Sequence, residues 1–239
     1  MKRLLIATIS LFIIAGGTFW FLGSDPSFDT EALKSVGRTA SKFQETLPKA
    51  DAGDAKAQFE IAKMYETGDG TAKEMALAVK WYMKAADQGN PAAKFQLAWM
   101  YANGIGVRQD YFTAAKYYRL AATFDNHTEA QFRMGELHFN GRGVEHDYGK
   151  AIKYYNQAAS KGHAAAQYLL GSMYIEGWGI KKDLIKAYIW LKLAQDKRAE
   201  ALAVNRKYDP VKKMQQLLPQ MTKFQLSEAE KRLAAMSAR

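Results

Sequence analysis

Residues 93–122 read AKFQLAWMYANGIGVRQDYFTAAKYYRLAA, and the same pattern returns at residues 130–159 as AQFRMGELHFNGRGVEHDYGKAIKYYNQAA. Two glycines mark each copy, and the pairs recur at intervals of 36, 37 and 36 residues: Gly68 and Gly70, Gly104 and Gly106, Gly141 and Gly143, Gly177 and Gly179. A fixed period of this length indicates stacked supersecondary units. The sequence predicts four of them, at 54–89, 90–126, 127–162 and 163–198.

Each unit has the apolar periodicity of two helices. In unit one, small and apolar residues share one face of a first helix (Ala57, Ile61, Met64 and Tyr65) and one face of a second (Ala78, Tyr82, Ala85 and Ala86). The glycines between them permit positive φ and end the first helix. Asp110, Asp147 and Asp183 are placed to cap the second helices, whereas unit one has Glu74, a poorer cap.

The longer interval arises from one extra residue within 123–129, where we expect a loop. Asn126 stands there in place of the glycines that end other second helices, and Asn tolerates the left-handed conformation. Small residues recur at one position of each helix, and we expect Trp81, Tyr117, Tyr154 and Trp190 to fill the space beside them. Because one helix pair cannot cover its own apolar face, stacked neighbours complete the core.

This pattern resembles the SEL-one-like repeat, a relative of the tetratricopeptide repeat, over residues 54–198. His138 and Leu191 depart from it, since each replaces a Tyr. The resemblance implies an all-α, right-handed α-solenoid that serves as a protein-interaction scaffold. Cysteine-rich members carry a disulfide in each repeat; this chain has no cysteine, so the activities of that subgroup do not transfer to it.

The N-terminus predicts export. Lys2 and Arg3 precede residues 4–23, which carry no charge and include eleven Leu, Ile or Phe, enough for one hydrophobic helix across a bilayer. We interpret residues 1–23 as a membrane anchor that leaves the rest of the chain outside the cytoplasm. A cleaved signal sequence ending near Gly17 is the alternative.

The flanks of the repeats are expected to be caps. Residues 24–53 form a linker and a short amphipathic helix, with Leu33, Val36, Phe43 and Leu47 among its apolar positions; a coiled-coil seam is the alternative. Residues 199–239 form basic capping helices. Asp209 and Pro210 start one helix, and either Thr222 with Gln225 or Ser227 with Glu230 starts the last, whose buried side is expected to hold Leu226, Ala229, Leu233 and Met236.

Charge and histidine content limit the kinds of ligand and catalytic chemistry that can be expected. The 239 residues have a formal charge of +10, and residues 197–239 carry ten Lys or Arg against four acids. We read that surface as solvated, with anionic lipid or an acidic partner as the alternative. His127 and His163 are expected to lie on loop surfaces, and His138 to replace a packing Tyr. Neither a catalytic set nor a metal site can be argued, so we expect no cofactor and no metal. Because the chain is expected to be exported, we also expect no nucleic acid.

Comparison of the four units shows which positions are free to bind. Lys63, Trp99, Glu136 and Ser172 form one variable column, and Asp69, Ile105, Arg142 and Trp178 form another. Aromatic residues at such positions are enriched in binding hot spots, although each could simply pack on a neighbouring helix. The candidate partner-binding residues are Trp99, Trp178, Arg142, Lys63 and Glu136.

These observations predict a non-enzymatic scaffold of the bacterial cell envelope. The repeats would lie in the periplasm and bind an extracytoplasmic protein through a groove lined mainly by first helices. The alternatives are a secreted repeat effector, released by signal cleavage, and an accessory enzyme acting on cell-wall glycan. Extended peptide and folded domain both remain open as ligands.

Overall fold

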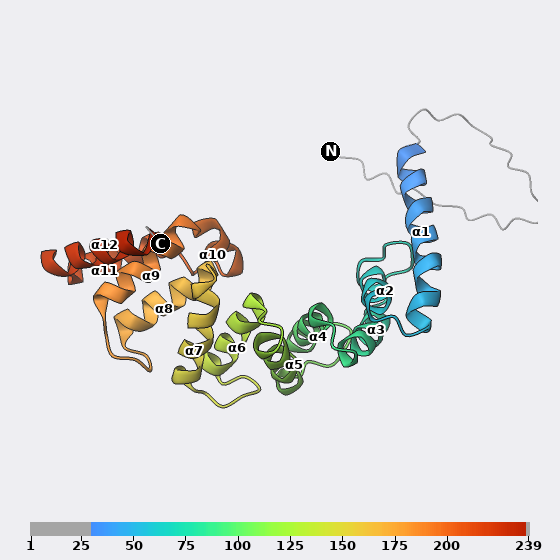
Figure 1. Ribbon diagram of the computed structural model, residues 1–239, viewed down its shortest axis with the longest axis horizontal. Helices are drawn as coiled ribbons and strands as arrows, with labels where there is room; N and C mark the ends of the chain where they lie inside the picture. The colour runs from blue at the N-terminus through green and yellow to red at the C-terminus, as the bar shows by residue number, and fades with distance from the viewer. Residues whose placement is uncertain (1–29, 238–239) are drawn as a thin grey trace, which may run out of the picture.

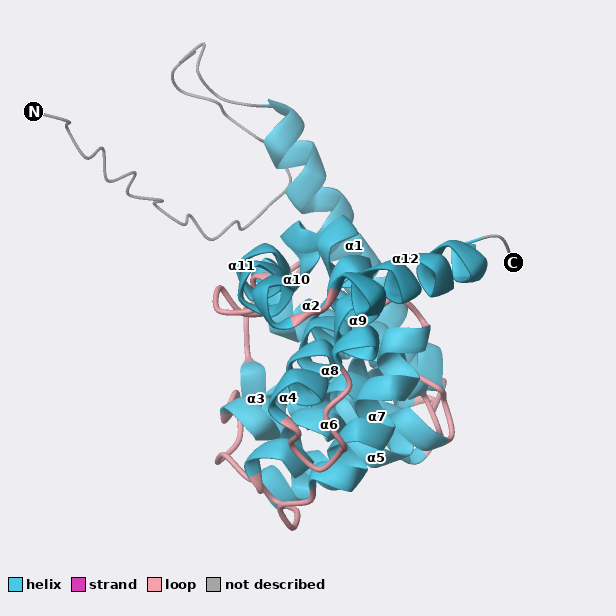
Figure 2. Cartoon of the chain, turned by 90° about the vertical axis from the view of Figure 1, so that its left-hand side faces the viewer, coloured by secondary structure: helices cyan, strands magenta, loops and turns pink. Residues whose placement is uncertain are grey.

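The computed structural model describes residues 30–237, and within that range every regular element is helical (Figures 1 and 2). The bounds of these elements are α1 (Thr30–Asp51), α2 (Ala55–Thr67), α3 (Met75–Asp87), α4 (Pro91–Asn103), α5 (Tyr111–Thr123), α6 (Thr128–Asn140), α7 (Tyr148–Ser160), α8 (Ala164–Glu176), α9 (Leu184–Asp196), α10 (Arg198–Val204), α11 (Pro210–Leu217), the 3-10 turn η1 (Leu218–Gln220) and α12 (Lys223–Ser237). Figure 1 shows α1 to α9 following one another in chain order along the molecule, whereas α10 lies back over α8.

The predicted helical pairs are present. Within each unit the two helices pack together most extensively, and each second helix packs next on the first helix of the following unit. The predicted anchor at residues 4–23 lies outside the described residues. Among helices within 30–237, none is long and apolar enough to cross a membrane.

Two glycines of each turn have different tasks. Gly68, Gly104, Gly141 and Gly177 are left-handed C-caps of the first helices, as predicted. The second glycine contacts the preceding unit: a Cβ on Gly106 would lie 2.6 Å from the carbonyl oxygen of Met75 at the start of α3. A Cβ on Gly70, Gly143 or Gly179 would likewise overlap α1, α5 or α7. The second glycine therefore sets the distance between neighbouring units.

The caps of the second helices are those predicted from the sequence. Asp110, Asp147 and Asp183 accept hydrogen bonds from backbone N–H groups in the first turns of α5, α7 and α9. Glu74 makes no side-chain cap at α3. Asn126 has a φ of 51° in the loop that holds the extra residue, which confirms its left-handed assignment.

The central aromatic position differs from the prediction by one residue. Tyr82, Tyr118, Tyr155 and Leu191 are the largest fully buried side chains of the second helices. Trp81 is also buried, but Tyr117, Tyr154 and Trp190 are only half-buried. The buried residue faces the small position of the first helix: a Cβ on Gly135 would meet the Tyr155 ring, and one on Gly171 would meet Leu191. His138 is buried and stacks on Tyr154 at 5.8 Å, as expected of a Tyr replacement.

His127 and His163 are not loop-surface residues, and that expectation was wrong. Each is the N-cap of a first helix, with Nδ1 accepting a hydrogen bond of 3.2 Å from Ala130 or Ala166 N–H. Asp54 and Asn90 make the same cap in units one and two. The His127 ring stacks on Phe95 at 4.5 Å, and the His163 ring stacks on Phe132 at 4.3 Å. Each imidazole therefore caps its own unit and packs on the previous one.

Both ends of the repeat array are covered. Phe43 of α1 meets Tyr65 edge-on at 5.5 Å, so α1 packs on the first unit as a cap. At the other end Asp209 caps α11, and hydrogen bonds from Arg198 lower the pKa of Asp209 to about 2. Thr222 and Gln225 form the capping box of α12, where Ala229 is fully buried. Met236 is half exposed and does not belong to the buried side predicted for it.

Gly89 and Gly143 separate backbone strain from contact between units. Both have positive φ, but a Cβ on Gly89 would meet nothing within 4 Å. We expect Gly89→Ala to cost about 1–2 kcal/mol of unfolding free energy, from strain alone. Gly143→Ala should cost about 1–3 kcal/mol more, because its methyl overlaps Tyr111 and Phe112. Urea unfolding followed by circular dichroism measures both; equal losses would show that the contact contributes nothing.

The His127 cap should make stability sensitive to acid. Burial lowers the pKa of His127, because the neutral ring is favoured in the folded state, and protonation would remove the Nδ1 acceptor. The stabilisation is thus present above the unfolded pKa of about 6.5 and is lost as the pH falls below it. His127→Asn keeps a cap of the Asn90 type without titrating, so its thermal midpoint should fall less than that of the wild type between about pH 7.5 and 5.5.

The exposed His146 supplies the matched control for this experiment. His146→Asn should retain the pH dependence of the wild type. Parallel midpoints for the wild type and His127→Asn over the whole interval would contradict the assignment.

Candidate functional site

The four residues of the variable column in the first helices differ in how far the fold exposes them. Lys63 lies exposed on α2, whereas Trp99 on α4 and Glu136 on α6 are half-buried. Ser172 on α8 is buried. One turn before it, Tyr168 stacks on Tyr208 at 5.1 Å and donates a hydrogen bond to the Lys207 carbonyl, so the C-terminal segment covers this face of the last unit. The open part of the first-helix face therefore lies toward the earlier units.

Three of the five predicted residues meet in one cleft. Trp99, Glu136 and Arg142 line a cavity of about 320 Å³ between α4 and α6, on the first-helix side. The other lining residues come from α4, α5 and α6: Ala102, Asn103, Tyr111, Tyr118, Arg133, Leu137 and Asn140. We call this cavity the first-helix cleft. Lys63 and Trp178 do not line it.

Charge in the cleft centres on Arg133. Its guanidinium forms ion pairs of 2.9 Å with Glu129 and 2.8 Å with Glu136. Glu129 also contacts His163 Nε2 at 2.9 Å, which joins units three and four. Burial raises the pKa of Glu136, although Arg133 opposes the change. Burial would also raise the pKa of Glu129, but the hydrogen bond with His163 and the charge of Arg133 outweigh it and hold that pKa below its ordinary value.

Two amides flank the cleft in equivalent places at the ends of α4 and α6. Asn103 Nδ2 donates to the Trp99 carbonyl, and Asn140 Nδ2 donates to the Glu136 carbonyl, each at 2.8 Å. These bonds fix the side chains and leave the amide oxygens as acceptors. The mixture of fixed amides, a guanidinium and aromatic faces suits a polypeptide with an apolar side chain.

Residues between the paired glycines pack on the preceding unit, which the sequence left open as the alternative to partner binding. Arg142 lies over the Tyr111 ring at 5.6 Å. Trp178 stacks on Tyr148 at 6.5 Å and meets Phe139 at 5.6 Å. Each therefore contacts the first residue of the preceding second helix. Trp178 remains 40 % exposed, so it has a packing partner and a free face.

Some cleft residues were not predicted as candidates, although they also stand at positions where the four units differ. Asn103 and Asn140 align with Thr67 and Glu176, and Arg133 aligns with Glu60, Gln96 and Leu169. The first-helix cleft contains no Ser, Thr, Cys or His, so it offers acceptors, donors and aromatic surface. Across the described residues, no group of three or more His, Cys, Asp or Glu is placed to hold a metal ion.

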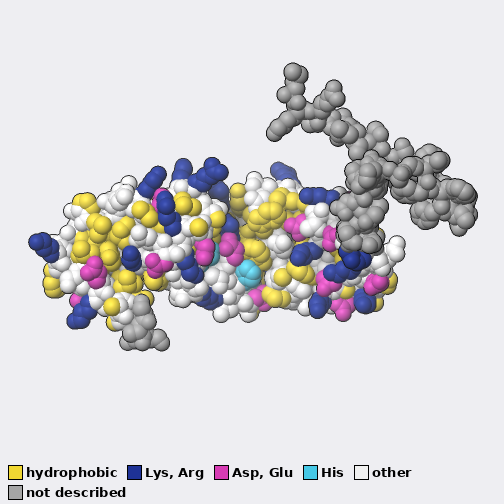
Figure 3. Space-filling view, turned by 90° about the horizontal axis from the view of Figure 1, so that it is seen from above, with side chains coloured by type: hydrophobic (Ala, Val, Ile, Leu, Met, Phe, Trp, Pro, Cys, Tyr) yellow, Lys and Arg dark blue, Asp and Glu magenta, His cyan; other side chains and the backbone are white. Residues whose placement is uncertain are grey.

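Several C-terminal cations already have partners. Figure 3 shows Lys and Arg side chains on both halves of the face that it draws. Arg198 pairs with Asp209, Lys213 pairs with Glu176 at 2.9 Å, and Lys197 donates to the Gly162 carbonyl. Part of the basic surface therefore joins the cap to the repeats, while Arg206, Lys207 and Lys212 stay exposed.

Comparison with known proteins identifies the repeats. The Sel1 repeat model matches four times, at residues 55–90, 91–123, 128–163 and 164–196, which together exceed half of the chain. The chain belongs to the Sel1 repeat family. Repeats of this family are protein-interaction scaffolds.

Two solved Sel1 structures resemble the chain in sequence and fold. A Sel1 repeat protein from Oxalobacter formigenes is 33 % identical with a TM-score of 0.63, over 72 % of this chain and 70 % of that one. The protective antigen c5321 of uropathogenic Escherichia coli is 34 % identical with a TM-score of 0.62, over 65 % of this chain and 33 % of that one.

One curated relative matches over a shorter region. Chitin synthase regulator SKT5 of Saccharomyces cerevisiae is 37 % identical over 67 residues, which is 28 % of this chain. The chain thus spans about a tenth of the length of that relative.

Proposed function

We propose that this Sel1 repeat protein is a non-enzymatic scaffold that binds an extracytoplasmic protein of the bacterial cell envelope in its first-helix cleft. The observation that carries the proposal is the convergence of Trp99, Glu136 and Arg142, from three separate segments, on one cleft. All three stand at positions where the four units differ, so the shared repeat packing does not require these residue types.

The chemistry of the cleft defines its ligand. Trp99 is half-buried and packs on two hydrophobic clusters that together span units one to three, so it offers a rigid aromatic surface at small entropic cost. Arg142 and the oxygens of Asn103 and Asn140 flank it with donors and acceptors. We infer that a partner inserts an apolar side chain against Trp99 while its backbone or polar groups meet the amides.

Placement in the envelope rests on the sequence. Residues 4–23 have the length and apolarity of a membrane-spanning helix, and Lys2 and Arg3 precede them as expected at a cytoplasmic end. We propose that these residues anchor the protein and that the repeats lie in the periplasm. The partner is then another periplasmic or membrane-attached protein.

Capture of the partner tests the cleft. In pull-downs from cross-linked envelopes, Trp99→Ala combined with Arg142→Ala should lower partner recovery roughly tenfold or more, because truncated hot-spot residues typically cost about 2 kcal/mol or more. The control is Trp178→Ala, which removes a large exposed aromatic outside the cleft and should leave recovery unchanged. Equal recovery with the double variant and the wild type would contradict the proposed site.

Fractionation with N-terminal sequencing tests the placement. The anchored form predicts an intact N-terminus in the membrane fraction and repeats that external protease digests in spheroplasts. A mature N-terminus at Thr18 in the soluble fraction would contradict the anchor. Protease resistance of the repeats in intact spheroplasts would contradict export altogether.

A further inference from the structure

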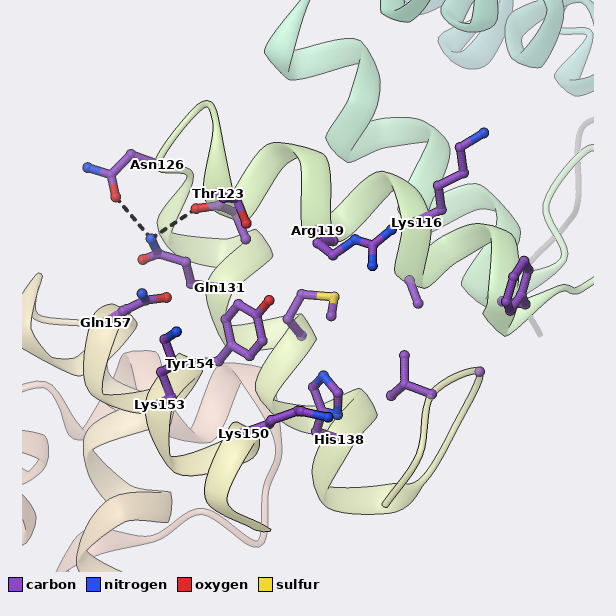
Figure 4. Close-up of a pocket in the computed structure, with 16 residues that line it drawn as sticks. Lys116, Arg119, Thr123, Asn126, Gln131, His138, Lys150, Lys153, Tyr154 and Gln157 are labelled. Carbon is purple, nitrogen blue, oxygen red and sulfur yellow. Dashed lines mark hydrogen bonds between the residues drawn. The ribbon is translucent and has the colours of Figure 1, made fainter. Parts of the chain in front are cut away.

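A second cavity, of about 610 Å³, lies on the other side of α6 from the first-helix cleft. Its lining from α6 consists of Gln131, Met134 and His138, whereas the cleft uses Arg133, Glu136, Leu137 and Asn140 of the same helix. The two sets point about half a helical turn apart. The cavity opens between α5 and α7, the second helices of units two and three (Figure 4). We call it the second-helix cavity.

Its lining charge is entirely positive. Lys116 and Arg119 line it from α5, and Lys150 and Lys153 line it from α7, while no Asp or Glu is among the lining residues. Figure 4 shows Arg119, Lys150 and Lys153 around the same space, whereas the Lys116 side chain extends away from it. Lys150 pairs with Asp147 at 3.3 Å. Within the described part of the chain the other three cations have no carboxylate partner, so the cavity holds uncompensated positive charge.

Amide groups at one end of the cavity are held in place. Gln131 is 2 % exposed, and its Nε2 donates to Asn126 Oδ1 at 2.9 Å and to the Ala122 carbonyl at 3.2 Å. Lys161 from the end of α7 also donates to the Asn126 carbonyl at 2.7 Å. The loop with the extra residue is therefore fixed where it borders the cavity.

Apolar surface accompanies the charge. Met134 and Val144 line the cavity, and Phe112 at its edge is 74 % exposed although it is large and apolar. An exposed aromatic beside unpaired cations suits a ligand with both carboxylates and an apolar side chain.

We propose that the second-helix cavity is a separate docking site for an extended acidic peptide segment of a partner protein, independent of the first-helix cleft. Lys116 and Arg119 stand one turn apart on α5, as do Lys150 and Lys153 on α7, so the charges are spread along two helices. Such spacing fits successive carboxylates on a chain better than a single phosphate. The fixed amide of Asn126 and the exposed amide of Gln157 supply partners for peptide groups.

The test uses a fluorescein-labelled peptide, Glu-Asp-Glu-Phe-Glu-Asp-Glu-Leu-Glu, and the full-length protein in fluorescence anisotropy. Lys116→Glu combined with Lys153→Glu should weaken its binding roughly tenfold or more, because reversed charges repel the carboxylates. The matched control is Lys80→Glu with Lys181→Glu. Lys80 occupies the same repeat position as Lys116 and Lys153, both control residues are exposed, and neither lines the cavity. This control should bind within about twofold of the wild type.

Three further measurements determine which kind of ligand binds in the second-helix cavity. The same peptide with Gln and Asn in place of its acids should bind at least tenfold more weakly. Trp99→Ala should leave peptide binding unchanged, which separates this site from the proposed cleft. Inorganic phosphate and phosphatidylglycerol vesicles should show no loss on reversal of Lys116 and Lys153; a loss confined to either probe would overturn the proposal in favour of a phosphate or lipid site.

Equal peptide binding by the two double variants would also overturn the proposal. Circular dichroism confirms that each variant is folded. If the charge reversal does not fold, Arg119→Gln with Lys153→Gln replaces it, and the same loss of affinity is expected from removal of two cations.

Discussion

The close approach of each second turn glycine to the helix before its unit is the contact on which the rest of the structure depends. At Gly70, Gly106, Gly143 and Gly179 no side chain fits, since a Cβ would overlap backbone or Cβ atoms of α1 at Gly70 and of the preceding second helix at the other three. The glycines also need a left-handed backbone, so conformation and space select the same residue. This contact repeats once per unit and fixes how far each helix pair lies from the last.

A fixed distance between units places α4, α5, α6 and α7 where their variable residues can meet. Trp99 and Glu136 are 37 positions apart in sequence, yet they line one cleft because their helices occupy equivalent places in adjacent units. The opposite side of α6 faces a cavity with only positive charge. One helix thus separates two surfaces of different chemistry, as expected when stacked helix pairs expose both of their faces.

Much of this fold could be predicted from the sequence because its determinants are local. Paired glycines, the Asp caps and the left-handed Asn126 depend on residues a few positions away. Contacts between units were harder to predict from the sequence. The imidazoles of His127 and His163 cap their helices while each stacks on a Phe of the preceding unit, a contact that no local pattern reveals. Ser172 shares a column with Trp99 but is buried, because the C-terminal segment folds back over α8.

Within the candidate site, repeat comparison predicted which columns vary but not which members of a column meet. Trp178 stacks on Tyr148, outside the cleft that holds Arg142 from the same column. Whether a residue of a variable column lines the cleft depends on which helix neighbours it in that unit. The most direct test replaces Asn103 or Lys80 with the photo-crosslinking residue p-benzoylphenylalanine in living cells. The account predicts an adduct with one extracytoplasmic protein from Asn103 and none from Lys80; no adduct from Asn103, or equal adducts from both positions, would contradict it.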